Sequence, residues 1–148
     1  RILIVSEDPE CDPKEWIPNP DEFNREITDS QWKAQVYRCM RRIPTLEEPS
    51  RKRGVVDLYD VSDDWLPIYD STRIKGYYMA IGSSGNQFKN APIAGHCMAE
   101  LIEACEKGQN HDEDPVQVKT VYTGLTLNMG FYSRNPEINP NSSFSVNG

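Results

Sequence analysis

Apolar residues repeat at helical spacing in a first stretch of the chain, where Trp32, Val36 and Ile43 fall on one face. Thr28 lies just before this stretch. Threonine commonly caps a helix N-terminus, because its hydroxyl can accept a hydrogen bond from a backbone N–H two or three residues on. The pattern therefore predicts an amphipathic helix over residues 29–42.

A second stretch of helical periodicity begins near Pro92, a residue type that suits the first turn of a helix because its missing N–H has no partner there. Gly108 can end this helix, since glycine readily adopts the left-handed conformation of a C-terminal cap. We expect a helix over residues 91–107 with six small or apolar residues on its buried face: Ile93, Ala94, Cys97, Leu101, Ala104 and Cys105.

Alternating or continuous apolar runs predict strands at residues 1–5, 54–60, 66–69, 76–82, 116–122 and 125–131. Residues 7–22 are rich in proline and acidic side chains and predict a loop. Two helices among separate strand runs indicate an α+β fold with a mostly antiparallel or mixed sheet. We assign residues 1–135 to one domain and the Asn-, Ser- and Pro-rich residues 136–148 to an extended or frayed tail.

The turn at residues 82–88, between an apolar run and the second helix, is the segment that best predicts a binding site. Gly82 and Gly85 permit positive φ and close backbone approach. A strand–turn–helix order aims unpaired N–H groups and the positive end of a helix dipole into one space, which suits an anion or an electron-rich ring edge. A glycine-containing turn is also a common plain connection, so the local pattern leaves both interpretations open.

Residues 54–68 precede this turn, and the two segments together resemble the C-terminal part of the FAD-dependent D-amino-acid oxidase and sarcosine or glycine oxidase family. That family carries a Tyr-Asp-x-Thr-Pro-Asp-x-x-Pro-Ile run, followed by a Gly-x-Tyr-x-Ala-x-Gly-x-Ser-Gly-x-Gly-x-Lys-x-Ala-Pro run. The resemblance covers residues 54–108 and keeps the family's order and spacing. The matching positions are Tyr59, Asp60, Asp64, Pro67, Ile68, Gly76, Tyr78, Ala80, Gly82, Ser84, Gly85, Phe88, Lys89, Ala91, Pro92 and Gly95.

The resemblance implies a partial fold of this family that lacks its N-terminal dinucleotide-binding βαβ unit, because no Gly-x-Gly-x-x-Gly fingerprint follows any predicted strand. It implies the C-terminal part of an FAD-dependent oxidoreductase that oxidises an amine or amino acid by hydride transfer to flavin. The isolated chain is then expected to be inactive and to bind FAD weakly or not at all. The implied partners are a small amine or amino-acid substrate and the missing N-terminal FAD-binding region, or a second copy of the chain.

By the same match, seven residues of the turn would line the flavin: Gly82, Ser83, Ser84, Gly85, Asn86, Gln87 and Phe88. Lys89 matches the lysine that contacts the substrate carboxylate in the sarcosine-oxidase branch. Asp60 and Asp64 match positions where we expect the carboxylates to cap nearby backbone N–H groups rather than to catalyse. We assign no catalytic residue and no metal ligand.

The chain departs from the family at two pairs of residues, with Ser62-Asp63 in place of Thr-Pro and Asn86-Gln87 in place of His-Gly. The second change puts a side chain where backbone passes close to the flavin. This favours an alternative, a non-enzymatic binding or interaction domain that retains a partial oxidase fold. Such a domain would form a dimer or higher oligomer through an exposed apolar face.

Composition narrows the classes of partner. The chain has 16 basic and 23 acidic side chains and a net charge of −7, which argues against a nucleic-acid partner. No apolar run has the length of a membrane span, and no signal peptide is visible. The four cysteines include no CxxC pair, so we expect no zinc site, and free thiols favour a reducing, cytoplasmic compartment. His96 and His111 are isolated, and we expect both at the surface.

Overall fold

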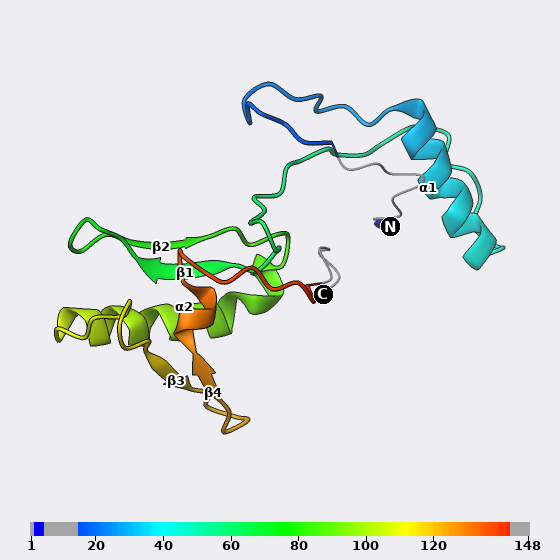
Figure 1. The fold of residues 1–148 in the computed structure, drawn as a ribbon. Coiled ribbons are helices and arrows are strands. Elements are labelled where there is room, and N and C mark those ends of the chain that lie inside the picture. The colour runs from blue at the N-terminus through cyan, green and yellow to red at the C-terminus, as the bar shows by residue number, and fades with distance from the viewer. Residues whose placement is uncertain (1, 5–14, 143–148) are drawn as a thin grey trace. The chain divides into compact units, whose positions relative to one another are not determined.

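The computed structural model describes residues 2–4 and 15–142, and the chain divides into two compact units, Arg1–Leu58 and Tyr59–Gly148 (Figure 1). The described residues contain two α-helices, four strands and one 3-10 helix. None of these helices is long and apolar enough to span a lipid bilayer.

The first unit is built around helix α1, Asp29–Arg42. Thr28 caps it, since its Oγ1 accepts a hydrogen bond from the Gln31 N–H at 3.2 Å. At the other end, the Ile43 N–H donates to the Cys39 carbonyl at 2.8 Å and closes the last turn. The predicted helix is confirmed at both ends, because its capping and periodicity are local properties of the sequence.

Two predicted strands of the first unit are wrong. Residues 2–4 form no strand, and residues 1 and 5 lie outside the described part of the chain. Residues 54–60 also run as irregular backbone, with Val55 86 % exposed. Apolar alternation is not sufficient for a strand, because a strand also needs a hydrogen-bonding neighbour and a surface to pack on.

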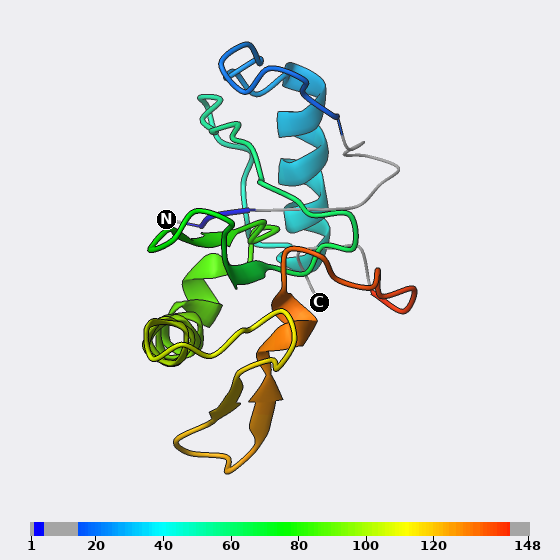
Figure 2. The same cartoon turned by 60° about the vertical axis from the view of Figure 1, so that its left-hand side comes forward.

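The second unit begins with an antiparallel pair, β1 at Ile68–Ser71 and β2 at Tyr78–Ile81. Ile68 lies opposite Ile81, and Ser71 lies opposite Tyr78. Helix α2, Gln87–Glu106, runs back along this pair, as both ribbon views show (Figures 1 and 2). The predicted strands 66–69 and 76–82 are thus present with shifted bounds.

A second antiparallel pair follows, β3 at Gln117–Lys119 and β4 at Thr126–Asn128, and it leads into the 3-10 helix η1 at Met129–Tyr132. Both predicted strands exist but are shorter than expected. The hydrophobic core of the unit lies between α2, β1, β3 and η1, and consists of Tyr69, Ala94, Cys97, Leu101, Val116, Val118 and Met129.

Helix α2 ends as the sequence predicts and begins earlier. Gly108 has φ +98° and donates to the Cys105 carbonyl at 2.9 Å, while Gln109 donates to the Ala104 carbonyl at 3.1 Å. These two bonds form a Schellman cap. The helix begins at Gln87, four residues before the predicted start, so Pro92 lies inside it. The prediction placed Pro92 in the first turn, whereas this helix accommodates the proline beyond its first turn.

The fold is therefore α+β, with two helices and two separate two-stranded antiparallel sheets. The expected fold class and the two main helices are confirmed, whereas the expected single sheet is replaced by two small ones.

Candidate functional site

The turn that connects β2 to α2 occupies residues 82–86 and has the predicted strand–turn–helix order. Gly82, Ser84 and Gly85 all have positive φ, at +63°, +50° and +82°. Ser84 is fully buried and is one of two non-glycine residues with positive φ among the described residues. A buried side chain in this conformation is tolerated only where surrounding contacts hold it.

Asp60 supplies those contacts. Its Oδ2 accepts hydrogen bonds from the Gly82 N–H at 2.8 Å and the Ser83 N–H at 3.2 Å, and its Oδ1 accepts one from Ser83 Oγ at 2.8 Å. The Asp60 carbonyl also accepts from the Ser84 N–H at 3.0 Å. Burial by itself would raise the pKa of Asp60, but the bonds from Ser83 and Gly82 outweigh it and lower the pKa below its ordinary value. The predicted capping role of this carboxylate is confirmed.

Asp64 organises the neighbouring turn in the same way. Its buried carboxylate accepts from the Leu66 N–H at 3.1 Å through Oδ1 and from the Asn139 N–H at 3.1 Å through Oδ2. Ser62 Oγ bridges this turn by donating to the Leu66 carbonyl at 2.5 Å. The capping role predicted for Asp64 is confirmed, and the tie to Asn139, 75 residues away, could not be read from local sequence.

The N–H groups available to a ligand are those of the first turn of α2. The N–H groups of Gly82, Ser83 and Ser84 already donate hydrogen bonds to Asp60. Asn86 is the N-cap residue but makes no side-chain capping bond, so the N–H groups of residues 87–89 have no capping acceptor. The donors expected along the whole turn are thus concentrated at the helix start.

Three side chains surround this helix start, and all are exposed: Gln87, Phe88 and Lys89. Phe88 is 97 % exposed, although its benzyl side chain is apolar. Lys89 lies in the first turn, where the helix dipole disfavours a cation in the absence of an anionic partner. The structure therefore brings the predicted residues 82–89 into one loop and helix turn, with Ser84 buried and Gln87, Phe88 and Lys89 facing solvent.

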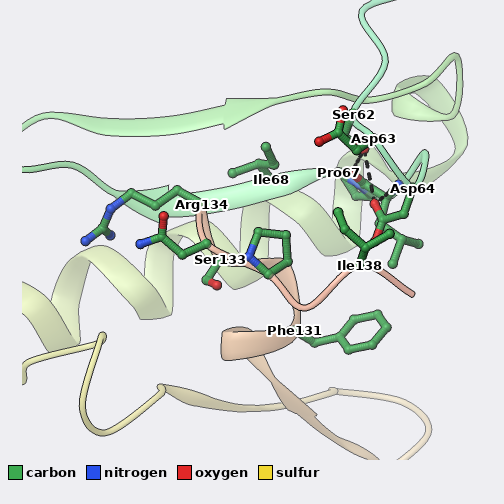
Figure 3. A pocket seen from close by; sticks show the side chains of 12 residues that line it. Ser62, Asp63, Asp64, Pro67, Ile68, Phe131, Ser133, Arg134 and Ile138 are labelled. Atoms are coloured by element: carbon green, nitrogen blue, oxygen red, sulfur yellow. Dashed lines mark hydrogen bonds between the residues drawn. The ribbon is translucent and has the colours of Figure 1, made fainter. Parts of the chain in front are cut away.

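A pocket of about 420 Å³ lies on the other side of the 62–66 turn, between that turn and the segment that follows η1 (Figure 3). Ser62 connects the two places, since its Cβ lies 3.5 Å from where a side chain on Gly82 would begin. The pocket is lined by Ser62, Asp63, Asp64, Leu66, Pro67, Ile68, Phe131, Ser133, Arg134, Asn135, Pro136 and Ile138.

A buried charge cluster lies at the other end of β1, and sequence reasoning did not find it. Asp70 is fully buried, and its Oδ2 accepts from the Arg134 backbone N–H at 2.7 Å and from Arg134 Nη1 at 2.9 Å. Arg134 Nη2 also pairs with Asp112. The hydrogen bond that Arg134 donates to Asp112, the charges of both aspartates and the hydrogen bond that it donates to Asp70 raise the pKa of Arg134, although burial opposes this. The sequence signal is weak, because Asp70 directly follows the predicted strand 66–69 and its partner Arg134 lies 64 residues away.

His111 lies next to this cluster and is 3 % exposed, so the expected surface position is wrong for this residue. His96 is partly exposed, and its Nε2 lies 3.1 Å from the Lys119 carbonyl. A histidine's burial depends on which elements pack around it, and that information is absent from its local sequence.

Two of the described cysteines, Cys97 and Cys105, have a raised thiol pKa. Burial raises the pKa of the Cys97 thiol, and burial with the charges of Asp70, Glu106 and Asp112 raises that of Cys105. Both thiols are therefore less nucleophilic than a free cysteine at neutral pH. No group of three His, Cys, Asp or Glu side chains among the described residues could hold a metal ion.

Compared with models of protein families, with curated proteins and with solved structures, the chain matches none.

Proposed function

We propose that this chain is the C-terminal part of an FAD-dependent oxidoreductase that oxidises an amine or amino acid by hydride transfer to flavin. The observation that supports this best is the 82–89 segment. Asp60 braces a turn with three positive-φ residues, and α2 begins directly after it with unpaired N–H groups. The proposal combines that geometry with the sequence resemblance over residues 54–108.

The chemistry at the helix start fits an electron-rich partner. Unpaired N–H groups and the positive end of the α2 dipole stabilise negative charge that lies in front of them. FAD, when bound, would supply the hydride acceptor, whose reduced ring carries such charge. The exposed ring of Phe88 would gain a packing surface, and the Lys89 ammonium would bind the substrate carboxylate.

FAD titration of the chain, alone and together with a separately expressed dinucleotide-binding domain of this family, tests the proposal. The chain alone is expected to leave the flavin spectrum and fluorescence unchanged. The pair is expected to hold flavin and to reduce it or release peroxide when an amine or amino acid is added. Tight stoichiometric FAD binding by the chain alone, or a pair that never holds flavin, contradicts the proposal.

Lys89→Ala is the sharpest single substitution in the reconstituted enzyme. Loss of one charge-assisted contact to a carboxylate removes about 1.5–3 kcal/mol of binding, so the substrate KM should rise about tenfold to a hundredfold. Lys75→Ala, at an exposed lysine of the β1–β2 loop, is the control and should leave KM unchanged. Equal KM values for both variants would remove Lys89 from the substrate site.

A second candidate is a non-enzymatic interaction domain, which the exposed apolar residues at this same place favour. Phe88 is 97 % exposed and Ile81, at the end of β2, is 50 % exposed, next to Asn86-Gln87 where the family has His-Gly. This function requires a dimer or higher oligomer that buries Phe88. Light scattering should then show an oligomer that Phe88→Ser converts to monomer, whereas a monomeric chain at high concentration rules this candidate out.

A further inference from the structure

One hydrogen bond to His111 identifies the tautomer of its ring. Its Nδ1 accepts a hydrogen bond from the Val116 N–H at 3.1 Å, and a ring nitrogen that accepts carries no proton. The ring is therefore the neutral tautomer with its proton on Nε2. The side chain of His111 is 1 % exposed.

The other ring nitrogen has no hydrogen-bond partner among the described residues. Nε2 lies 3.7 Å from Asp70 Oδ1, which is beyond hydrogen-bond distance. Asp70 Oδ1 already accepts from the Ser71 N–H at 2.6 Å and from Ser71 Oγ at 3.3 Å. His111 is thus held in place by its bond to Val116 and by packing, rather than by Asp70.

Val116 connects the 109–115 turn to the second strand pair. It is 5 % exposed and belongs to the core. Its N–H donates to His111, and its carbonyl accepts from the Met129 N–H at 2.9 Å, at the start of η1. The His111–Val116 bond therefore joins the 109–115 turn to the residue that precedes β3.

We propose that the His111–Val116 bond is an acid-sensitive latch, whose opening by protonation of His111 releases the 109–116 turn and the start of β3. An imidazolium ring cannot accept a hydrogen bond, so its formation leaves the buried Val116 N–H without an acceptor. Histidine is the side chain whose charge changes between pH 5 and 8. A buried neutral histidine therefore links local opening to proton uptake in that range.

The charged groups around His111 affect how stable an imidazolium would be at this position. Asp70 on β1 attracts an imidazolium, whereas Arg134, after η1, carries a positive charge held against both Asp70 and Asp112. Cys105 on α2 lies near both of these aspartates, and its raised pKa keeps it uncharged in this pH range. Arg134 thus offsets the attraction that Asp70 would exert on an imidazolium.

Amide hydrogen exchange of Val116 in the full chain, corrected for the intrinsic exchange rate, tests the proposal. A histidine that is exposed to water has an ordinary pKa of about 6.5. Opening that takes up one proton becomes more frequent in proportion to 1 + 10^(6.5 − pH), which rises from about 2 at pH 6.5 to about 33 at pH 5.0, so Val116 protection should fall about sixteenfold between these pH values. The Ser84 amide, bonded to the Asp60 carbonyl in a different part of the unit, should lose none of its protection.

His111→Asn is the matched variant, because the Asn side-chain oxygen can take the place of Nδ1 as an acceptor and does not titrate. Its Val116 protection should not vary over the same pH range. Nitrogen NMR of the wild-type ring gives a second measurement that needs no variant, and it should show the Nε2–H tautomer at pH 7.5. Protection of Val116 that is independent of pH, an Nδ1–H tautomer, or an equal loss at Ser84 would each overturn the proposal.

Discussion

Removal of the Asp60 carboxylate is expected to loosen the 82–86 turn by a measurable amount. In Asp60→Ala, the buried Gly82 N–H loses its acceptor, at about 1–3 kcal/mol, while the Ser83 N–H and Oγ can turn to water. Asp60 is itself exposed, so solvent screens its charge and the lower half of the range applies. We expect about 1.5 kcal/mol of local destabilisation.

The Ser84 amide reports this change, because its acceptor, the Asp60 backbone carbonyl, is retained in the variant. A loss of about 1.5 kcal/mol corresponds to a roughly twelvefold drop in its hydrogen-exchange protection. Asp63→Ala, three residues on at an exposed carboxylate, is the control and should change protection less than about twofold. Equal protection in Asp60→Ala and the wild type would refute the view that Asp60 braces the turn.

The bonds that the Asp60 carboxylate accepts make the stability of the turn depend on pH, and the sign follows from the lowered pKa of Asp60. A group with a lowered folded-state pKa contributes stability that is fully present above its unfolded pKa, about 3.9 for aspartate. This contribution is lost as the pH falls through the lower folded value. The protection difference between wild type and Asp60→Ala should therefore be constant from pH 7 to 5 and shrink at the most acidic pH values.

Four other substitutions test the fold. Gly108→Ala should destabilise the chain by about 1 kcal/mol, because φ at Gly108 is +98°. Gly95→Ala should stabilise the chain by about 0.5–1 kcal/mol, because Gly95 lies in the interior of α2 with open space around it. Urea unfolding measures both changes. Thr28→Ala should lower the stability of α1 by about 1 kcal/mol, seen by circular dichroism, since the capping bond to its N-terminus is lost. The hydrogen bond that Tyr78 donates to Glu106 raises the pKa of Tyr78 to about 12, so Glu106→Gln should shift the ultraviolet titration of Tyr78 toward pH 10. The stability from this bond is present below pH 10 and is lost as the pH rises through 12.

The sequence by itself determined the features whose causes lie within a few residues. Helix α1 has the predicted bounds because Thr28 and the apolar face are adjacent in the chain. The Gly108 cap follows from backbone freedom at one residue. The resemblance over residues 54–108 led us to expect capping by Asp60 and Asp64, and both carboxylates accept backbone N–H bonds, Asp60 in the 82–86 turn and Asp64 in the 62–66 turn.

Only the tertiary structure decided what depends on segments far apart in the chain. Asp70 is bonded to Arg134, 64 residues away, and His111 is buried beside them, so neither environment is encoded in neighbouring residues. The strand predicted over residues 54–60 has the right alternation but no neighbouring strand, and hydrogen-bonded pairing is a property of two segments rather than one. The start of α2 depends on the same kind of information, because Asp60 holds the preceding turn and so sets where the helix can begin.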